Sequence, residues 1–278
     1  MDRHCYFNGK FTTLDKVQIS PYDIGLLRGY AICDVMCTHN GKPFHTKEHW
    51  QRFMDGAREL NLRLPITANK FAEILNYLLK SSGFKKANFR TVLTGGINSD
   101  GGTIYEPGRE TFYILVEKFT FLPKEYYTKG IGVITLDYDR SYPIAKITNY
   151  VAAIKNQDEK KKSKAFEIIY TKNGKASEAS TCNFFIVKKG KLITTKNDIL
   201  IGITRNVVIK LAKKNKIPVV ERDIKVPELF SADEMFLTAT NKDVVPVVRI
   251  DGKKVGNGKV GETTKKMMKL FAEFVEKY

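Results

Sequence analysis

Tyr142-Pro-Ile-Ala-Lys146-Ile-Thr-Asn149-Tyr150 differs from the other lysine-containing stretches of this chain in lying between two kinds of predicted structure. An extended segment at 131–138 precedes it, and a helical pattern starts near Thr148. Lys146 therefore lies at a boundary between elements. A lysine at such a boundary is a candidate catalytic nucleophile, because a reactive amine must be held beside the group that it attacks.

Three later stretches carry groups that complement an amine. Glu178-Ala-Ser-Thr-Cys-Asn183 supplies a carboxylate, Gly202-Ile-Thr204 opens a predicted helix, and Leu237-Thr-Ala-Thr240 ends an apolar strand. A pyridoxal phosphate (PLP) enzyme needs a lysine for the aldehyde and for proton transfer, and an anion beside the pyridine nitrogen. It also needs N–H groups, hydroxyls and an arginine for the phosphate. Each residue alone has an ordinary explanation, but their order and spacing together predict a PLP site.

Length and composition exclude several classes of protein. The chain has 278 residues, 42% hydrophobic and 28% charged, which is typical of a globular protein with one large domain or two smaller ones. The start has no apolar signal region, and no run of about 18 apolar residues occurs, so we expect neither secretion nor a membrane span but a cytoplasmic location. The cysteine spacing predicts neither a disulfide framework nor a metal site.

The net charge of +17 is unevenly distributed. Residues 1–120 hold 16 Lys/Arg and 12 Asp/Glu, which leaves 31 and 18 for residues 121–278. The densest run, 155–164, mixes both signs and continues a helical pattern, so it is interpreted as a solvated face. No nucleic-acid module signature accompanies it, and we expect no nucleic-acid partner. A positive field instead favours anionic small-molecule substrates.

Hydrophobic periodicity predicts an α+β chain in two parts. Residues 1–120 form a small domain with strands at 4–12, 16–20, 88–94 and 111–116 and helices at 46–62 and 67–81. Its Gly-rich loop, 95–102, is either a wide turn or a substrate lid, and not a dinucleotide site. Residues 121–128 are a linker. Residues 129–278 form a larger domain with strands at 131–138, 165–171, 182–188, 191–195, 217–224, 234–240 and 244–250, helices at 148–163, 203–214 and 263–277, and a helical turn at 227–230.

Seven motifs follow one another along nearly the whole chain: Tyr6-Phe-Asn8-Gly9-Lys10, Asp23-Ile-Gly25-Leu-Leu-Arg28-Gly29-Tyr30, Glu48-His49-Trp-Gln-Arg52-Phe, Lys146-Ile-Thr-Asn149-Tyr150, Ser177-Glu178-Ala-Ser180-Thr-Cys-Asn183-Phe, Gly202-Ile-Thr204-Arg205 and Ala232-Asp233-Glu234-Met-Phe-Leu-Thr238-Ala-Thr240. In this order they resemble the class IV aminotransferases, the fold-type IV PLP family of branched-chain aminotransferases, D-amino-acid aminotransferases and aminodeoxychorismate lyase. The resemblance implies a two-domain enzyme, with a small N-terminal α/β domain and a larger mixed-sheet, barrel-like C-terminal domain.

The resemblance also implies a role for each matching residue that contacts the cofactor ring. Lys146 would be the catalytic residue, linked covalently to PLP. Glu178 would pair with the pyridine nitrogen, and Tyr150 would border the O3′ side of the ring. A catalytically silent scaffold would have lost Lys146 or Glu178, and both are present.

Five further residues would bind the phosphate or act across an interface. Arg52 would contact the phosphate, together with the backbone at Ile203 and Thr204 and the hydroxyl of Thr240. The resemblance implies a homodimer in which loops of the neighbouring subunit wall each site. Arg28 and its surroundings would therefore act across the interface.

The roles implied for the phosphate and the cofactor ring leave two arginines, Arg28 and Arg90, without an explanation. Arg28 lies in an apolar turn, where a charge is costly without an anion, and strand alternation places Arg90 opposite the face of Phe89 and Thr91. Both could form structural salt bridges. Both could instead clamp a substrate carboxylate, which suits glutamate and 2-oxoglutarate as one substrate pair.

The branches of the family differ around these residues. The L-branched-chain branch shares an arginine like Arg90 and the Asn149-Tyr150 pair. It often has one more residue between the lysine and the Asn-Tyr pair, however, and it usually has a tyrosine in the region of Arg28. The D-amino-acid branch shares the Lys146-x-x-Asn149 spacing, although its Arg-x-His carboxylate trap is absent and Cys33 replaces a frequent aromatic residue. The lyase branch shares this spacing but usually has a different first motif and a different strand-end sequence. We therefore expect a D-amino-acid:2-oxo-acid transaminase (glutamate/2-oxoglutarate, alanine/pyruvate) that uses Arg28 and Arg90, with the L-branched-chain activity second and the lyase third.

Overall fold

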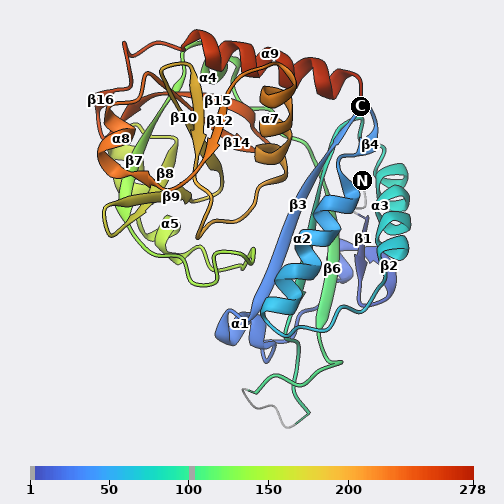
Figure 1. The fold of residues 1–278 in the computed structure, drawn as a ribbon. Helices are drawn as coiled ribbons and strands as arrows, with labels where there is room; N and C mark the ends of the chain where they lie inside the picture. Colours follow the sequence, from blue (N-terminus) through green and yellow to red (C-terminus); the bar gives the residue numbers. More distant parts are fainter. Residues whose placement is uncertain (1–3, 100–103) are drawn as a thin grey trace. The chain divides into compact units, whose positions relative to one another are not determined.

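The chain divides into two compact units in the computed structural model, which describes residues 4–99 and 104–278 (Figure 1). The first unit holds the residues up to Thr120, the segment Ile144–Asn149 and Tyr278. The second holds Phe121–Pro143 and Tyr150–Lys277. The Gly-rich loop is described only up to residue 99, so the end of that predicted loop lies outside the described residues.

The first unit is built on an antiparallel sheet with the strand order β2-β1-β6-β5-β3-β4. Its strands are β1 (His4–Phe7), β2 (Lys10–Thr13), β3 (Ala31–His39), β4 (Lys42–Pro43), β5 (Ala87–Thr94) and β6 (Thr111–Lys118). The Asn8-Gly9 hairpin is confirmed, since both residues have positive φ and Phe7 pairs with Lys10. This two-residue turn divides the predicted strand 4–12 into β1 and β2. The predicted strand at 16–20 is wrong, because Leu14–Lys16 form a 3-10 helix and residues 17–20 form no strand.

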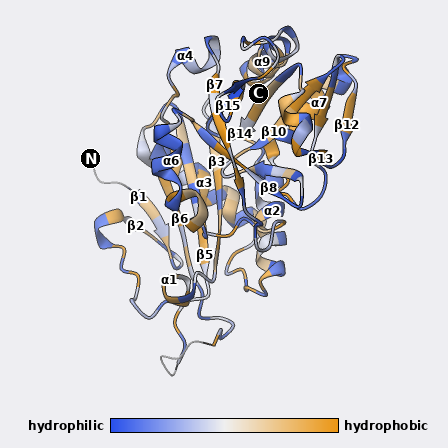
Figure 2. Cartoon of the chain, turned by 90° about the vertical axis from the view of Figure 1, so that its left-hand side faces the viewer, coloured by the Kyte–Doolittle hydropathy of each residue, from blue (hydrophilic) through white to orange (hydrophobic). Residues whose placement is uncertain are grey.

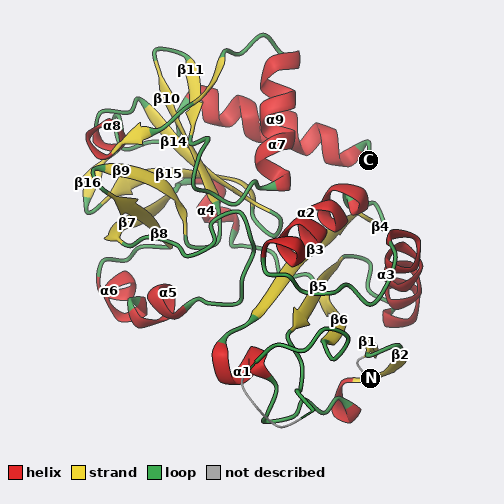
Figure 3. Ribbon diagram, turned by 60° about the horizontal axis from the view of Figure 1, so that its bottom comes forward, coloured by secondary structure: helices red, strands yellow, loops and turns green. Residues whose placement is uncertain are grey.

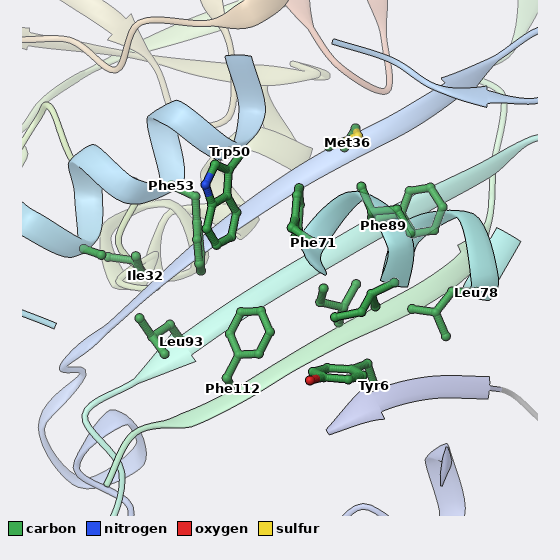
Figure 4. Packing of buried hydrophobic residues seen from close by; sticks show 14 of the residues in the cluster. Tyr6, Ile32, Met36, Trp50, Phe53, Phe71, Leu78, Phe89, Leu93 and Phe112 are labelled. Carbon is green, nitrogen blue, oxygen red and sulfur yellow. The ribbon is translucent and has the colours of Figure 1, made fainter. Parts of the chain in front are cut away.

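Two helices cover one face of this sheet. The predicted helices are confirmed as α2 (Thr46–Glu59) and α3 (Ala68–Ser82), which carry apolar residues at helical spacing. Figure 4 shows Trp50 and Phe53 from α2 and Phe71 from α3 gathered with Phe112 of β6 in one buried cluster. This packing fixes α2 against β3, the strand that anchors two of the candidate site residues described below.

Strand β3 is the longest of the elements that the periodicity did not predict, and β9, which carries Glu178, is another. All but one of the residues of β3 are buried, so β3 shows none of the alternation that marks a half-buried strand. It pairs with β5 from Ala31 to Cys37. A short helix, α1 (Ile24–Arg28), precedes it, and the Asp23 carboxylate caps α1 by accepting from the Gly25 N–H at 2.7 Å.

The second unit is built on a mixed sheet with the order β12-β11-β10-β14-β15-β7-β8-β9-β13, and β16 pairs with β15. Its strands are β7 (Ile131–Asp137), β8 (Glu167–Lys172), β9 (Lys175–Ala179), β10 (Asn183–Lys188), β11 (Lys191–Thr194), β12 (Val219–Glu221), β13 (Ile224–Lys225), β14 (Glu234–Ala239), β15 (Asp243–Ile250) and β16 (Lys253–Lys254). Parallel pairs join β7 to β8, β7 to β15, and β11 to β12, which confirms the expected mixed sheet. The predicted strand 217–224 is two strands, because β12 and β13 pair with different partners.

The helices of the second unit are α4 (Lys124–Thr128), α5 (Val151–Lys155), α6 (Gln157–Lys162), α7 (Ile203–Lys214), α8 (Val226–Phe230) and α9 (Glu262–Glu276). Helices α7 and α9 contact each other and pack on the sheet (Figure 3). The predicted helix 148–163 is instead α5 and α6. They are separated at Asn156, whose side-chain amide donates to the Ala152 carbonyl at 2.8 Å and competes with the backbone. Figure 2 shows α6 as strongly hydrophilic, as expected of a solvated face.

Candidate active site

Lys146 is held by strand β3 of the first unit. The Cys33 N–H donates to the Lys146 carbonyl at 2.8 Å, and the Thr148 N–H donates to the Ala31 carbonyl at 3.2 Å. An isolated antiparallel bridge joins Ile32 to Ile147 between these two bonds. Helix α5 begins only at Val151, so Lys146 lies in an irregular stretch before the helix rather than in its first turn. Its backbone is nevertheless fixed, and its side chain is half-buried.

A buried carboxylate on the same strand orients Arg52. The Asp34 Oδ2 accepts from Arg52 Nε at 2.9 Å and lies 2.7 Å from Arg52 Nη2, while Asp34 Oδ1 lies 2.6 Å from His49 Nδ1. Burial alone would raise the pKa of Asp34, but the charges of Arg52 and His49 and their hydrogen bonds hold it below its usual value. Burial lowers the pKa of His49. Arg52 is thus a fixed cation, suited to bind a phosphate group.

Replacing Asp34 by asparagine should destabilise the protein. The change leaves the guanidinium of Arg52 without its buried counter-charge, and removal of one partner of a buried pair costs about 3 kcal/mol or more. Urea unfolding of Asp34→Asn, compared with Asp55→Asn on the exposed face of α2, would measure the loss. Equal stability of the two variants would contradict this role for Asp34.

Glu178, on β9, is buried in the second unit and accepts hydrogen bonds from groups of that unit. The donors include the Leu200 N–H at 3.2 Å, the Asn183 side-chain amide at 3.3 Å and a close Nη1 of Arg140. These donors fix the carboxylate and compensate its charge away from water. Sequence reasoning missed Arg140, and no local pattern could have revealed it, because the ion pair joins residues 38 positions apart.

The N-terminus of α7 presents backbone donors for which the described residues offer no acceptor. Gly202, the N-cap residue, provides no side-chain cap, and Ile203 and Thr204 are buried. Within the described ranges, no acceptor is found for the N–H groups of Ile203 and Thr204. Glycine is needed at 202, because a Cβ there would lie 2.1 Å from the side-chain oxygen of Asn183. A buried helix N-terminus of this kind fits a phosphate group.

The end of β14 adds hydroxyl groups to the second unit. Thr238 pairs with Asn183 across β10 and β14, and its buried Oγ1 has no partner in the part of the chain that the structure describes. Thr240 follows at the end of the strand and is half-buried. Tyr150, half-buried, is the residue before α5. The donor set of this unit therefore fits the phosphate and ring nitrogen of PLP.

The site residues predicted from the sequence fall into two groups. Lys146 and Arg52 belong to the first unit, and both are anchored to neighbouring residues of β3, Cys33 and Asp34. The others belong to the second unit: Tyr150, Glu178, Ile203, Thr204 and Thr240. Within that unit, Asn183 connects Glu178 to the start of α7, because it donates to both Glu178 and the Leu200 carbonyl.

The two candidate substrate arginines are both exposed. Arg28 ends α1 and donates to the Leu27 carbonyl at 3.0 Å, so within the chain it does not incur the burial cost that the sequence suggested. Arg90 lies on the face of β5 opposite the buried Phe89 and Thr91, which confirms the predicted alternation. Its guanidinium forms an ion pair with Glu117 at 3.2 Å.

Two further searches concern the described residues only. None of their helices combines the length and the apolar character that a membrane crossing requires. No group of three or more His, Cys, Asp or Glu side chains is arranged there to hold a metal ion.

Comparison with known proteins identifies a family for this chain. The family model for amino-transferase class IV matches residues 31–250. A protein of Methanocaldococcus jannaschii, provisionally described as a branched-chain-amino-acid aminotransferase, is 33% identical over 98% of this chain and 96% of its own length. The D-alanine aminotransferase of Staphylococcus aureus is 27% identical over 98% of both chains.

Solved structures give the same fold. The branched-chain amino acid aminotransferase of Escherichia coli has a TM-score of 0.91 with 25% identity, over 99% of this chain and 95% of that one. The branched-chain amino acid aminotransferase of T.th., solved with pyridoxamine 5′-phosphate, also has a TM-score of 0.91, with 24% identity over 100% and 95% of the two chains. The architecture is therefore that of the fold-type IV enzymes. The chain belongs to the class IV aminotransferases, PLP-dependent enzymes that act on amino acids and 2-oxo acids.

Proposed function

We propose that this protein transfers the amino group of a D-amino acid to a 2-oxo acid, with Lys146 as its catalytic residue. The observation that carries the proposal is the donor set of the second unit. There the Leu200 N–H, the Asn183 amide and Arg140 donate to the buried Glu178 carboxylate, and Gly202 gives α7 no side-chain cap. When bound, PLP supplies an electron sink for the carbon that loses its proton. The protein supplies the groups that bind the cofactor and move that proton.

Each proposed residue has a defined task. The amine of Lys146 binds the cofactor covalently and then carries the proton as a general base and acid. The Glu178 carboxylate holds a proton on the pyridine nitrogen, and Tyr150 contacts the O3′ side of the ring. Arg52, oriented by Asp34, binds the phosphate together with three groups of the second unit, the N–H groups of Ile203 and Thr204 and the hydroxyl of Thr240.

Two features support a D-configured donor. The Lys146-x-x-Asn149 spacing is that of the D-amino-acid branch, and D-alanine aminotransferases are among the relatives. Glutamate/2-oxoglutarate and alanine/pyruvate are the proposed substrate pairs. The second candidate, an L-branched-chain aminotransferase, is favoured by the 33% identity to the M. jannaschii protein.

Single-turnover mixing would separate these activities. The PLP-loaded protein is mixed in turn with D-alanine, D-glutamate, L-leucine and L-glutamate, and the visible absorbance of the bound cofactor is followed. We expect the band to disappear with the D-amino acids. Its loss with the L-amino acids alone would establish the second candidate. A stable band with all four would contradict both transaminase candidates and would favour the lyase.

We propose that Arg28 and Arg90 bind the substrate carboxylates. Arg90→Ala should raise the KM for 2-oxoglutarate and for the D-donor by roughly 10- to 100-fold, because a hydrogen bond between charged groups contributes about 1.5–3 kcal/mol. Glu117→Gln is the matched control, since it removes the ion-pair partner of Arg90 and keeps the guanidinium. Equal KM changes in both variants would mean that the loss of the Arg90–Glu117 ion pair, and not the loss of a substrate contact, causes the change.

We further propose a homodimer in which Arg28 acts on the site of the partner. Helix α1 supports this proposal, because Leu26 is 69% and Leu27 is 42% exposed beside Tyr22, which is 60% exposed. A short helix that exposes such apolar side chains is suited to an interface. Sedimentation equilibrium would test the assembly, and Leu26→Asp should produce monomers. A monomeric wild-type protein with full activity would refute the shared site.

A further inference from the structure

A buried cluster of polar side chains lies outside the groups assigned to the cofactor. Lys242, in the turn between β14 and β15, directs its Nζ toward the turn between β9 and β10. There it contacts Thr181 Oγ1 at 2.6 Å and Cys182 Sγ at 3.2 Å, and it lies 3.5 Å from Glu167 Oε2. Glu167, on β8, also accepts from the hydroxyls of Ser180 and Thr181. An amine, a thiol and a carboxylate therefore share one site.

The cluster is closed to bulk water. Lys242 is 9%, Cys182 5% and Glu167 3% exposed. Burial acts first to lower the pKa of Lys242, but Cys182 and Glu167 raise it above its usual value, and the pKa of Glu167 is held low mainly by Lys242 against the effect of burial. The resting state is thus an ammonium–carboxylate pair beside a neutral thiol, since burial raises the pKa of Cys182 to about 11.

We propose that Lys242 and Cys182 become joined covalently through a single oxygen atom when the protein is exposed to molecular oxygen. The thiol, the ammonium group and one O₂ give the S–O–N bridge, one water molecule and one proton. Sulfur and nitrogen are each oxidised by two electrons, and the four electrons reduce the two oxygen atoms, of which one enters the bridge and the other the water. The Glu167 carboxylate accepts the ammonium proton, so that the nitrogen lone pair is free to form the bond to oxygen.

The geometry favours this product over the usual fates of a cysteine. The two reacting atoms are already in contact, and groups fixed in contact react as if at very high concentration. A bridge through one oxygen requires less movement from the 3.2 Å contact than a direct nitrogen–sulfur bond does. O₂ is small and uncharged, so it can enter a packed site that excludes bulky electrophiles. The neutral thiol makes the reaction slow, and we expect it over hours to days.

The bridge would connect two turns that lie next to, or contain, proposed cofactor ligands, namely Glu178 and Thr240. Glu178 and Asn183 flank the turn of Cys182, and Thr240 lies two residues before Lys242. Oxidation would therefore rigidify this part of the second unit. If the proposed cofactor roles of these residues hold, the bridged protein should also release PLP more slowly.

Peptide mass spectrometry would test the bridge without any assay of activity. The purified full-length protein is held in air-saturated or oxygen-free buffer, with and without a later thiol reductant, and digested with trypsin. The expected result is an intact mass about 14 Da higher, for one oxygen gained and two hydrogens lost. Because trypsin cannot cleave after a modified Lys242, peptides 176–188 and 226–249 should be joined. Reduction should separate them.

Two variants and one stability measurement complete the test. Cys182→Ser and Lys242→Arg should each abolish the mass change, and Lys242→Arg keeps a cation beside Glu167. The midpoint of thermal unfolding should rise by several degrees in the oxidised wild type and in neither variant. An unchanged mass would overturn the proposal, as would a gain of oxygen on Cys182 alone. A product about 2 Da lighter would also overturn it, because that mass indicates a direct nitrogen–sulfur bond.

Discussion

Lys146→Ala should lose amino transfer by at least about 10³-fold, because the variant lacks both the covalent attachment of PLP and the group that moves the proton. The fold should persist, since β3 holds this segment through backbone groups and the Ile32–Ile147 bridge. Turnover with each amino donor measures the loss of amino transfer. Borohydride treatment followed by peptide mass analysis measures the covalent attachment of PLP, since the wild type should carry the cofactor on Lys146 and the variant should not.

Lys155→Ala is the matched control for this variant, because Lys155 is an exposed lysine at the end of α5. It should retain both turnover and covalent labelling. Turnover near the wild-type rate in Lys146→Ala would remove the basis of the proposed function. Labelling of a different lysine in the wild type would move the catalytic role to that residue.

Glu178→Gln should lower the turnover rate by roughly 10²- to 10³-fold and leave substrate KM little changed. An amide of the same shape can still accept from Arg140 and from the Leu200 N–H, but it carries no charge to hold a proton on the pyridine nitrogen. The visible spectrum of the bound cofactor should shift with the loss of that proton. Steady-state kinetics and a pH titration of this spectrum measure the two effects.

Glu125→Gln, an exposed position on α4, controls for the loss of one carboxylate. A Glu178→Gln variant with a normal rate and spectrum would show that Glu178 only supports the fold. Loss of cofactor binding without a change in the rate at saturating PLP would instead limit its role to affinity.

The sequence predicted best the elements whose signals are local. Helix α7 begins and ends where its apolar period begins and ends, and α2 and α3 follow theirs closely. Strand β3 lacked such a signal because both of its faces are covered. The break at Asn156 depends on one side-chain hydrogen bond, which a periodic pattern cannot register.

The same distinction applies to the candidate site. Family motifs located Lys146 and Glu178, but the groups that position these residues come from distant parts of the chain. Arg140 reaches Glu178 by tertiary packing alone. Asp34 gave a usable signal, since a lone carboxylate inside the apolar run at 31–36 needs a buried partner, which is Arg52.

The attachment of Ile144–Asn149 to β3 has a consequence for how this protein could be divided. The backbone leaves the second unit before residue 144 and returns to it after residue 149, so no single cut separates the two units. A fragment that ended at residue 120 would lack Lys146, the proposed catalytic residue, and the complementary fragment would lack the strand that fixes it. Recombination between relatives with one crossover between β3 and residue 144 would separate Lys146 from β3, which predicts that these two segments are inherited together.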